Sequence, residues 1–304
     1  MKNNFYYALF VALFAMIAVY SCSRHIENAE PPQIVAISLS DDCNLETGSL
    51  NNIAFEELNS RLVELNDRYP SQIMSRGRFW NWFKRIVFGD FLGACLGAGV
   101  TWSPVGAVFF GIMGSINGAL YESHLSGGLA YVPENVNISE SWNPMIIRPI
   151  DVGFVHNRVI YEVYQDLGNR ILTSSDEIIR SKVIEKMKKY VPAIQFNTSI
   201  LNNTVIPNLL DNAIKSYENT PSEDIFGMVA VQYPSRNNEV ETLTLFCTKY
   251  SSIPDFTTRT RYVEDFTATV TSSGIGEDSK NYILSSISVA SYSDMLWKEV
   301  VVEQ

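Results

Sequence analysis

The feature that most constrains the fold is an uncharged stretch, Phe91–Tyr121, with Pro104 near its middle. The proline lies in Thr-Trp-Ser-Pro-Val-Gly, a composition that is typical of a turn. The stretch is therefore predicted to form two short apolar helices, residues 86–100 and 106–121, joined by that turn. Such a hairpin is buried either in the core of the protein or in a lipid bilayer.

Small residues recur along both arms of this hairpin. The glycines are Gly89, Gly93 and Gly97 on the first arm and Gly111, Gly114 and Gly118 on the second. Each glycine inside a helix costs about 1 kcal/mol relative to alanine, so these glycines do not serve helix stability. Small residues four apart form a groove that another helix backbone can approach closely. The six glycines are therefore predicted to be membrane or helix packing sites, and they allow a homo-oligomer to form through the hairpin.

This glycine pattern resembles the glycine-zipper segments of bacterial outer-membrane lipoproteins and, more loosely, those of small bacteriocins. The resemblance covers the hairpin alone, and it implies tight helix packing rather than an activity. Each arm has about 15 residues and a length of roughly 22 Å, which is short of the roughly 30 Å of a bilayer core. Partial insertion or oligomeric packing fits these lengths better than a full crossing, and burial in a soluble core is the alternative.

Basic and aromatic residues alternate just before the hairpin. The residues predicted to lie at a membrane interface are Arg76, Arg78, Trp80, Trp82, Lys84 and Arg85. Tryptophan rings favour the headgroup level of a bilayer, and cations there meet lipid phosphates. The alternative is an ordinary amphipathic helix whose aromatic face packs on the protein core.

The N-terminus has the pattern of an export signal. Lys2 precedes Ala8–Tyr20, an apolar run that is short for a membrane-spanning helix but typical of a signal peptide. The run ends in Val-Tyr-Ser-Cys, which resembles the lipobox of bacterial lipoproteins, although Tyr20 is bulkier than the usual residue. The resemblance implies that residues 1–21 are removed and that Cys22 is lipidated, with membrane lipids as the partner. By analogy with other lipoproteins, Ser23 favours the outer membrane over the inner one. An ordinary secretory signal or an N-terminal membrane helix is the alternative.

The composition narrows the class of protein further. The formal net charge of the 304 residues is −10, which argues against nucleic-acid binding, because phosphates need a basic face. The remaining cysteines, Cys43, Cys95 and Cys247, lack any metal-ligand spacing. One disulfide, for example Cys43 to Cys247, would suit an oxidising compartment, and three buried thiols are the alternative.

The chain is predicted to be mainly α, in five parts. A signal peptide (residues 1–21) precedes a polar, lipid-anchored flexible tether (22–51) and an amphipathic helix (52–75), for which Ile53, Phe55, Leu58, Leu62 and Leu65 supply the apolar spacing. Residues 76–122 contain the aromatic and basic lead-in and the Gly-rich hairpin. Residues 123–304 are predicted to form a mainly helical globular domain. Residues 228–233 and 242–247 are either strands of a small β-hairpin or helix. This layout resembles that of large lipoproteins of the Bacteroidota, and the resemblance implies no activity.

No catalytic constellation is found. The three histidines are His25, His124 and His156, and a Cys–His pair of Cys247 and His156 has no local support. Phosphate-loop, Gly-x-Ser-x-Gly, His-Glu-x-x-His and EF-hand patterns do not occur in the sequence. The sequence therefore predicts no catalytic residue, no metal and no cofactor.

Three hypotheses follow. The first is a lipid-anchored protein of the cell envelope with a structural or interaction role, whose hairpin packs in or on the membrane and which binds another envelope protein. The second is a membrane-active effector, bacteriocin-like or pore-forming. The third is a lipid-anchored enzyme without a recognisable motif.

Overall fold

The computed structural model describes residues 41–71, 78–101, 103–126, 146–196, 205–216, 226–227, 229–231 and 234–299. Within these residues the chain is helical almost throughout and forms no strand, so the predicted mainly-α fold is confirmed. The chain divides into two compact units, Met1–Leu45 and Glu46–Gln304. All contacts described below lie inside the second unit.

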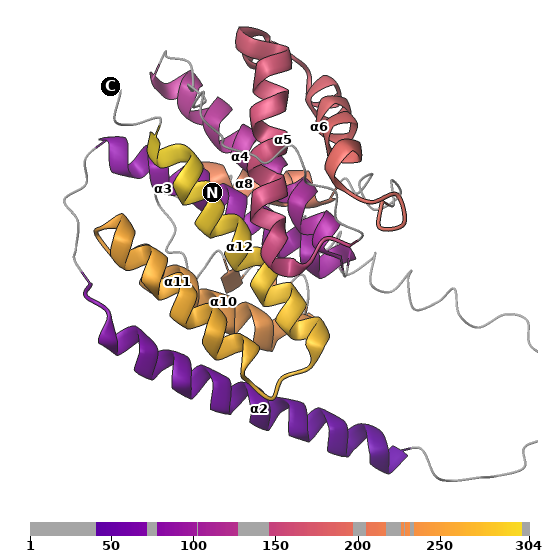
Figure 1. Ribbon diagram of the computed structural model, residues 1–304, viewed down its shortest axis with the longest axis vertical. Coiled ribbons are helices and arrows are strands. Elements are labelled where there is room, and N and C mark those ends of the chain that lie inside the picture. The colour runs from indigo at the N-terminus through magenta and orange to yellow at the C-terminus, as the bar shows by residue number, and fades with distance from the viewer. Residues whose placement is uncertain are drawn as a thin grey trace, which may run out of the picture. The chain divides into compact units, whose positions relative to one another are not determined.

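The elements of the chain appear in Figure 1. In chain order they are α2 (Asp41–Arg68), α3 (Arg78–Thr101), α4 (Pro104–Ser126), η1 (Pro149–Asp151), α5 (Val152–Leu167), η2 (Gly168–Leu172), α6 (Asp176–Tyr190), α8 (Val205–Ser216), η3 (Pro234–Arg236), α10 (Asn237–Tyr250), α11 (Phe256–Thr271) and α12 (Glu277–Glu299).

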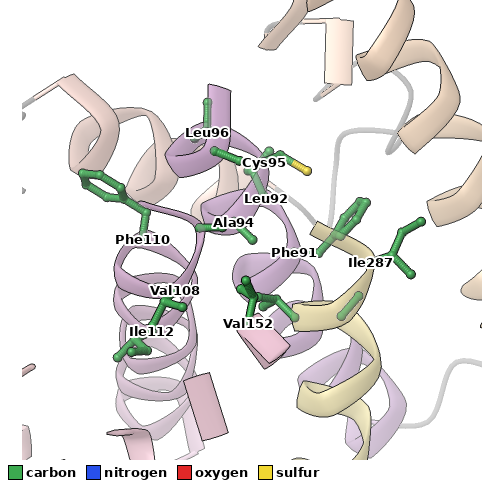
Figure 2. Close-up of a cluster of buried hydrophobic side chains, with 14 of the residues drawn as sticks. Phe91, Leu92, Ala94, Cys95, Leu96, Val108, Phe110, Ile112, Val152 and Ile287 are labelled. Atoms are coloured by element: carbon green, nitrogen blue, oxygen red, sulfur yellow. The ribbon is translucent and has the colours of Figure 1, made fainter. Parts of the chain in front are cut away.

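The predicted hairpin consists of α3 and α4, and it forms the core of the helical bundle. The two helices pack against each other, and α5, α8 and α12 all contact them. Every residue from Ile86 to Gly99 and from Val105 to Ile116 is buried. Figure 2 shows side chains of both helices close to Ile287 of α12 and Val152 of α5. A helix that is apolar on all sides needs such a complete cover.

One helix, Pro104–Tyr121, is long and apolar enough to cross a membrane, and 78% of it is buried inside the molecule. The core helix of a soluble protein has the same length and composition, so this observation is weak support for membrane insertion.

The predicted hairpin (76–122) and the predicted C-terminal helical region (123–304) pack against each other in the structure. Both belong to the single unit Glu46–Gln304. The physical reason is that the C-terminal helices supply the cover for the hairpin: α12 lies along α3, and α5 packs on both α4 and α12 (Figure 1).

Helix α2 begins earlier than predicted, at Asp41, so the tether cannot extend to residue 51 as a flexible segment. The helix ends at Arg68, before the predicted limit of residue 75. Its buried stripe is Phe55, Leu58, Leu62 and Leu65, at spacings of three and four. Ile53 is 55% exposed and does not belong to that stripe. Hydrogen bonds join α2 to the C-terminal helices, among them Thr242 Oγ1 to Asn59 Oδ1 at 2.8 Å and Tyr262 OH to Asn66 Oδ1 at 2.8 Å.

The small β-hairpin considered for residues 228–233 and 242–247 is not formed by the described residues. Thr242–Cys247 lie inside α10, whose buried residues include Val240, Leu243 and Phe246. The hydroxyls of Thr242 and Thr244 donate to carbonyl groups four residues earlier, which satisfies them within the helix. Burial of the helical stripe therefore outweighs the β-propensity of the alternating threonines. Met228, Gln232 and Tyr233 lie outside the described residues.

Candidate functional site

The predicted lipidation site and most of the interfacial side chains fall outside the described residues. Cys22 and Arg76 are among them, and so are the side chains of Arg78, Trp80, Trp82, Lys84 and Arg85, whose backbone forms the first two turns of α3. Lipidation and interfacial placement therefore stay predictions from the sequence.

The glycines of α3 lie where the backbone of α4 comes closest. A Cβ atom on Gly93 would lie 2.1 Å from the carbonyl oxygen of Phe110, and a Cβ atom on Gly97 would lie 2.1 Å from that of Gly106. A Cβ atom on Gly114 would lie 2.2 Å from the carbonyl oxygen of Gly89. Real Cβ atoms do not approach backbone atoms this closely. We name these three contacts between α3 and α4 the glycine seam; its residues are Gly89, Gly93, Gly97, Gly106, Phe110 and Gly114.

The other two glycines of α4 are also buried. A Cβ atom on Gly111 would meet His156 Cδ2 and Val289 Cγ1, each at 3.2 Å, and the Asp90 carbonyl oxygen at 3.4 Å, so this glycine admits α5 and α12 as well as α3. Gly118 is buried near the end of α4. A further close approach, which the sequence analysis missed, joins Gly153 of α5 to the carbonyl oxygen of Ser288 on α12, 2.2 Å from a Cβ position.

A layer of buried polar side chains lies between the hairpin and the helices α5 and α12. Its members are Asp90, Ser115, His156, Tyr164, Ser293 and Trp297, all with less than 9% of their surface exposed. Ser293 Oγ donates a short hydrogen bond to Asp90 Oδ2, and Trp297 Nε1 donates to Ser115 Oγ at 3.1 Å. His156 Nε2 lies 3.8 Å from Asp90 Oδ2. The layer therefore connects four helices through one carboxyl group.

Three atoms of this layer have no hydrogen-bond partner among the residues that the structure describes: Asp90 Oδ1, His156 Nε2 and Tyr164 OH. Burial raises the pKa of Asp90 well above its usual range, although hydrogen bonds from Ser293, Ser115 and Trp297 act in the opposite direction. Burial lowers the pKa of His156 to about 4, against the effect of its hydrogen bond with Asn157. Both shifts favour the uncharged forms of Asp90 and His156.

The layer contains a serine, an imidazole and a carboxyl group, but it is not arranged as a hydrolytic triad. A triad requires the serine to bond the imidazole, which the carboxylate orients. Here Ser293 bonds Asp90 directly, and Nδ1 of His156 lies 3.0 Å from Asn157 Oδ1. Asp90, His156 and Ser293 are each 0% exposed, so a substrate cannot contact them in this conformation. The structure pairs His156 with these groups and not with Cys247, which lies on α10.

A second buried carboxyl group, Asp294, has a full set of partners. Arg259 Nε and Nη2 bond its two oxygens at 2.6 and 3.1 Å, and Tyr250 OH donates to it at 2.6 Å. Arg259 also donates to the carbonyl oxygens of Ile253 and Pro254. This is a bidentate pair in a satisfied network, a typical structural use of a buried charge.

A groove with a volume of about 550 Å³ opens between α11, α12 and η1. Helix α11 contributes Thr260, Val263, Thr267 and Thr271, at spacings of three or four residues. Helix α12 contributes Glu277, Asn281, Leu284, Ser288 and Ser291, at the same spacings. Each wall of the groove is thus one stripe of one helix face. The groove has the size of a binding site, and the sequence analysis did not identify it.

Asp90 was not predicted as a site residue. Its distinguishing signal is that it is the one charged residue between Ile86 and Tyr121. The groove gave no such signal, because its two walls are ordinary amphipathic helices until they are placed side by side.

Comparison with known proteins adds no relative: no protein-family model matches the chain, and neither a curated protein nor a solved structure matches it.

Proposed function

We propose that this protein is a lipid-anchored protein of the cell envelope with a structural or interaction role, and that its hairpin is the core of the folded unit rather than a membrane anchor. The observation that carries the proposal is the glycine seam. Because α4 already occupies the close-approach face of α3, that face is not available to lipid or to a second copy of the chain. Attachment to the membrane then depends on Cys22 and its acyl chains.

The proposal is tested by membrane partitioning of the chain from residue 22 onward. The lipidated protein and its Cys22→Ser variant are mixed with vesicles and washed at alkaline pH and high salt. We expect the lipidated form to stay bound and the variant to wash off. Retention of the variant would overturn the proposal, because the protein would then bind lipid without its anchor.

A second candidate function is that of a membrane-active effector. It is favoured by the length and apolar character of Pro104–Tyr121, and by Asp90 being the one charged residue of the sequence between Ile86 and Tyr121. Dye leakage from anionic vesicles tests this candidate with the same Cys22→Ser variant. Leakage would support the effector, and intact vesicles would count against it.

A further inference from the structure

We infer that the groove between α11 and α12 is a docking site for a basic amphipathic helix of a partner protein. The inference deepens the proposed interaction role, on which it rests, by naming a surface and the chemistry of its partner.

The shape of the groove fits a helix. Its lining residues on α12 run from Glu277 to Tyr292, roughly 22 Å at 1.5 Å per residue. Those on α11 run from Thr260 to Thr271, roughly 16 Å. Two helices that lie side by side form a groove between them, and the apolar stripe of a third helix can pack into that groove.

The walls of the groove offer both apolar contact and polar side chains, among them Thr267, Asn281 and Ser291. Val263 and Leu284 are only partly buried and pack on the core, and Ile150 of η1, at the rim, is 56% exposed. Hydroxyls on the walls already donate to backbone carbonyls: Thr260 to Phe256 at 3.0 Å and Thr271 to Thr267 at 2.8 Å. Ser288 donates to Ile150 at 2.9 Å. Leucine-like side chains of a partner would bury surface against Val263, Leu284 and Ile150, and polar side chains beside them could bond the remaining hydroxyl and amide groups of the walls.

The charge of the groove predicts the charge of the partner helix. Lys280 is matched by Glu277 at 3.0 Å, and Glu264 has no ion pair with any described residue. The groove therefore presents a net negative charge on a chain whose formal charge is −10. A partner with lysine or arginine beside its apolar stripe complements this surface. A second copy of the chain would bring like charge to it, and anionic lipid headgroups would be repelled in the same way.

The test uses synthetic peptides of 18 residues and the chain from residue 22 onward with Cys22→Ser. One peptide places leucines at spacings of three and four and lysines beside them; a second replaces every lysine by glutamate; a third scrambles the leucine positions. Binding is measured by fluorescence anisotropy at low salt. We expect the basic peptide to bind at least about tenfold more tightly than either of the other two.

Two substitutions locate the site. Leu284→Glu places a charge on the groove floor, and we expect it to weaken binding at least about tenfold. Glu264→Lys is expected to weaken binding of the basic peptide about fivefold and to improve binding of the acidic one. Glu241→Lys, the same charge change at an exposed position of α10 outside the groove, is the matched control and leaves binding within about twofold. Helical content and melting temperature of each variant show that it is folded, and Glu264→Lys keeps the test valid if Leu284→Glu is not.

Equal binding of the basic and acidic peptides, binding that Leu284→Glu and Glu264→Lys leave unchanged, or no binding at about 1 mM would each overturn the inference. Self-association that Leu284→Glu abolishes would also overturn it, since the occupant would then be a second copy. None of these outcomes depends on the anchor, so the partitioning experiment on Cys22 succeeds or fails separately.

Discussion

Asp90 and Asp294 are both fully buried in the same bundle, Asp294 on α12 and Asp90 in contact with Ser293 of that helix, yet their surroundings differ. Asp294 is bound by Arg259 and Tyr250, and each of its oxygens accepts a hydrogen bond. Asp90 has no cation in hydrogen-bond contact, and its Oδ1 accepts no hydrogen bond. One region therefore stabilises a charge, and the other suppresses it.

The comparison shows that the two buried carboxyl groups affect the free energy of unfolding in different ways. A paired buried charge costs little once the pair is formed, but either partner alone is expensive. An unpaired buried carboxyl group is kept neutral, and it costs stability at every pH at which the unfolded chain would ionise it. The Asp294 region is therefore sensitive to loss of a partner, and the Asp90 region is sensitive to pH.

The largest effect is expected for Arg259→Met. The substitution leaves Asp294 buried without its cation, and we expect a loss of about 3–5 kcal/mol in the free energy of unfolding, measured by urea denaturation at pH 7. Adding Asp294→Leu to Arg259→Met removes the stranded carboxyl group and should restore much of the loss. A single variant that unfolds within 1 kcal/mol of the wild type, taken as about the error of the method, would show that Asp294 is not held by this pair.

The same substitution at the two carboxyl groups should have opposite signs. Asp294→Asn weakens the pair with Arg259 and is expected to destabilise the protein by about 3 kcal/mol. Asp90→Asn removes the cost of keeping a carboxyl group neutral, while the side-chain oxygen can still accept from Ser293, so we expect a gain of about 1 kcal/mol or more at pH 8. Both are measured by thermal and urea denaturation, and two losses of equal size would erase the distinction between the regions.

The glycine seam, which lies beside Asp90, fixes the distance between α3 and α4. Gly93→Ala would bring a Cβ atom to 2.1 Å from the Phe110 carbonyl oxygen, so α3 and α4 must separate, at a cost of about 2 kcal/mol or more. Gly276→Ala is the matched control, because nothing lies within 4 Å of its Cβ position, and it should change stability by less than about 0.5 kcal/mol. Equal stability of the two variants would mean that the seam is looser than the structure shows.

The smallest effect, per pH unit, is the pH dependence of the Asp90 region. The raised pKa of Asp90 contributes stability that is fully present below its ordinary pKa of 3.8 and is lost as pH rises. The lowered pKa of His156 has the opposite sign: its stability is present above 6.5 and is lost as pH falls toward 4. The two effects therefore act in opposite directions between pH 4 and 6.5.

Single variants separate these two contributions. His156→Gln should leave a stability that already falls as pH rises from 4, and Asp90→Asn should leave one that falls as pH drops from 6.5 toward 4. Urea denaturation at half-unit intervals between pH 4 and 9 measures both slopes relative to the wild type. Parallel profiles for all three proteins would show that the layer does not titrate as described.

Local side chains mark where some of the helices begin. Ser175 begins α6 as its N-cap, with a hydrogen bond from the Ile178 N–H, and Pro207 lies in the first turn of α8. Such boundaries depend on side chains next to the backbone groups that they satisfy, so they can be predicted from sequence. The stripe of Thr242–Cys247 was ambiguous for the opposite reason: alternation and helical spacing coexist there, and packing in α10 decides between them.

The sequence by itself determined the uncharged hairpin, its turn at Pro104 and the glycine spacing, because these follow from hydrophobicity and backbone freedom along one segment. Only the tertiary structure decided what the hairpin packs against, because the cover comes from α5, α8 and α12, up to two hundred residues later in the chain. It also decided that Asp90 meets Ser293 and His156 without a cation, and that α11 and α12 leave a groove. Each of these depends on distances between segments far apart in the sequence, and no local propensity encodes them.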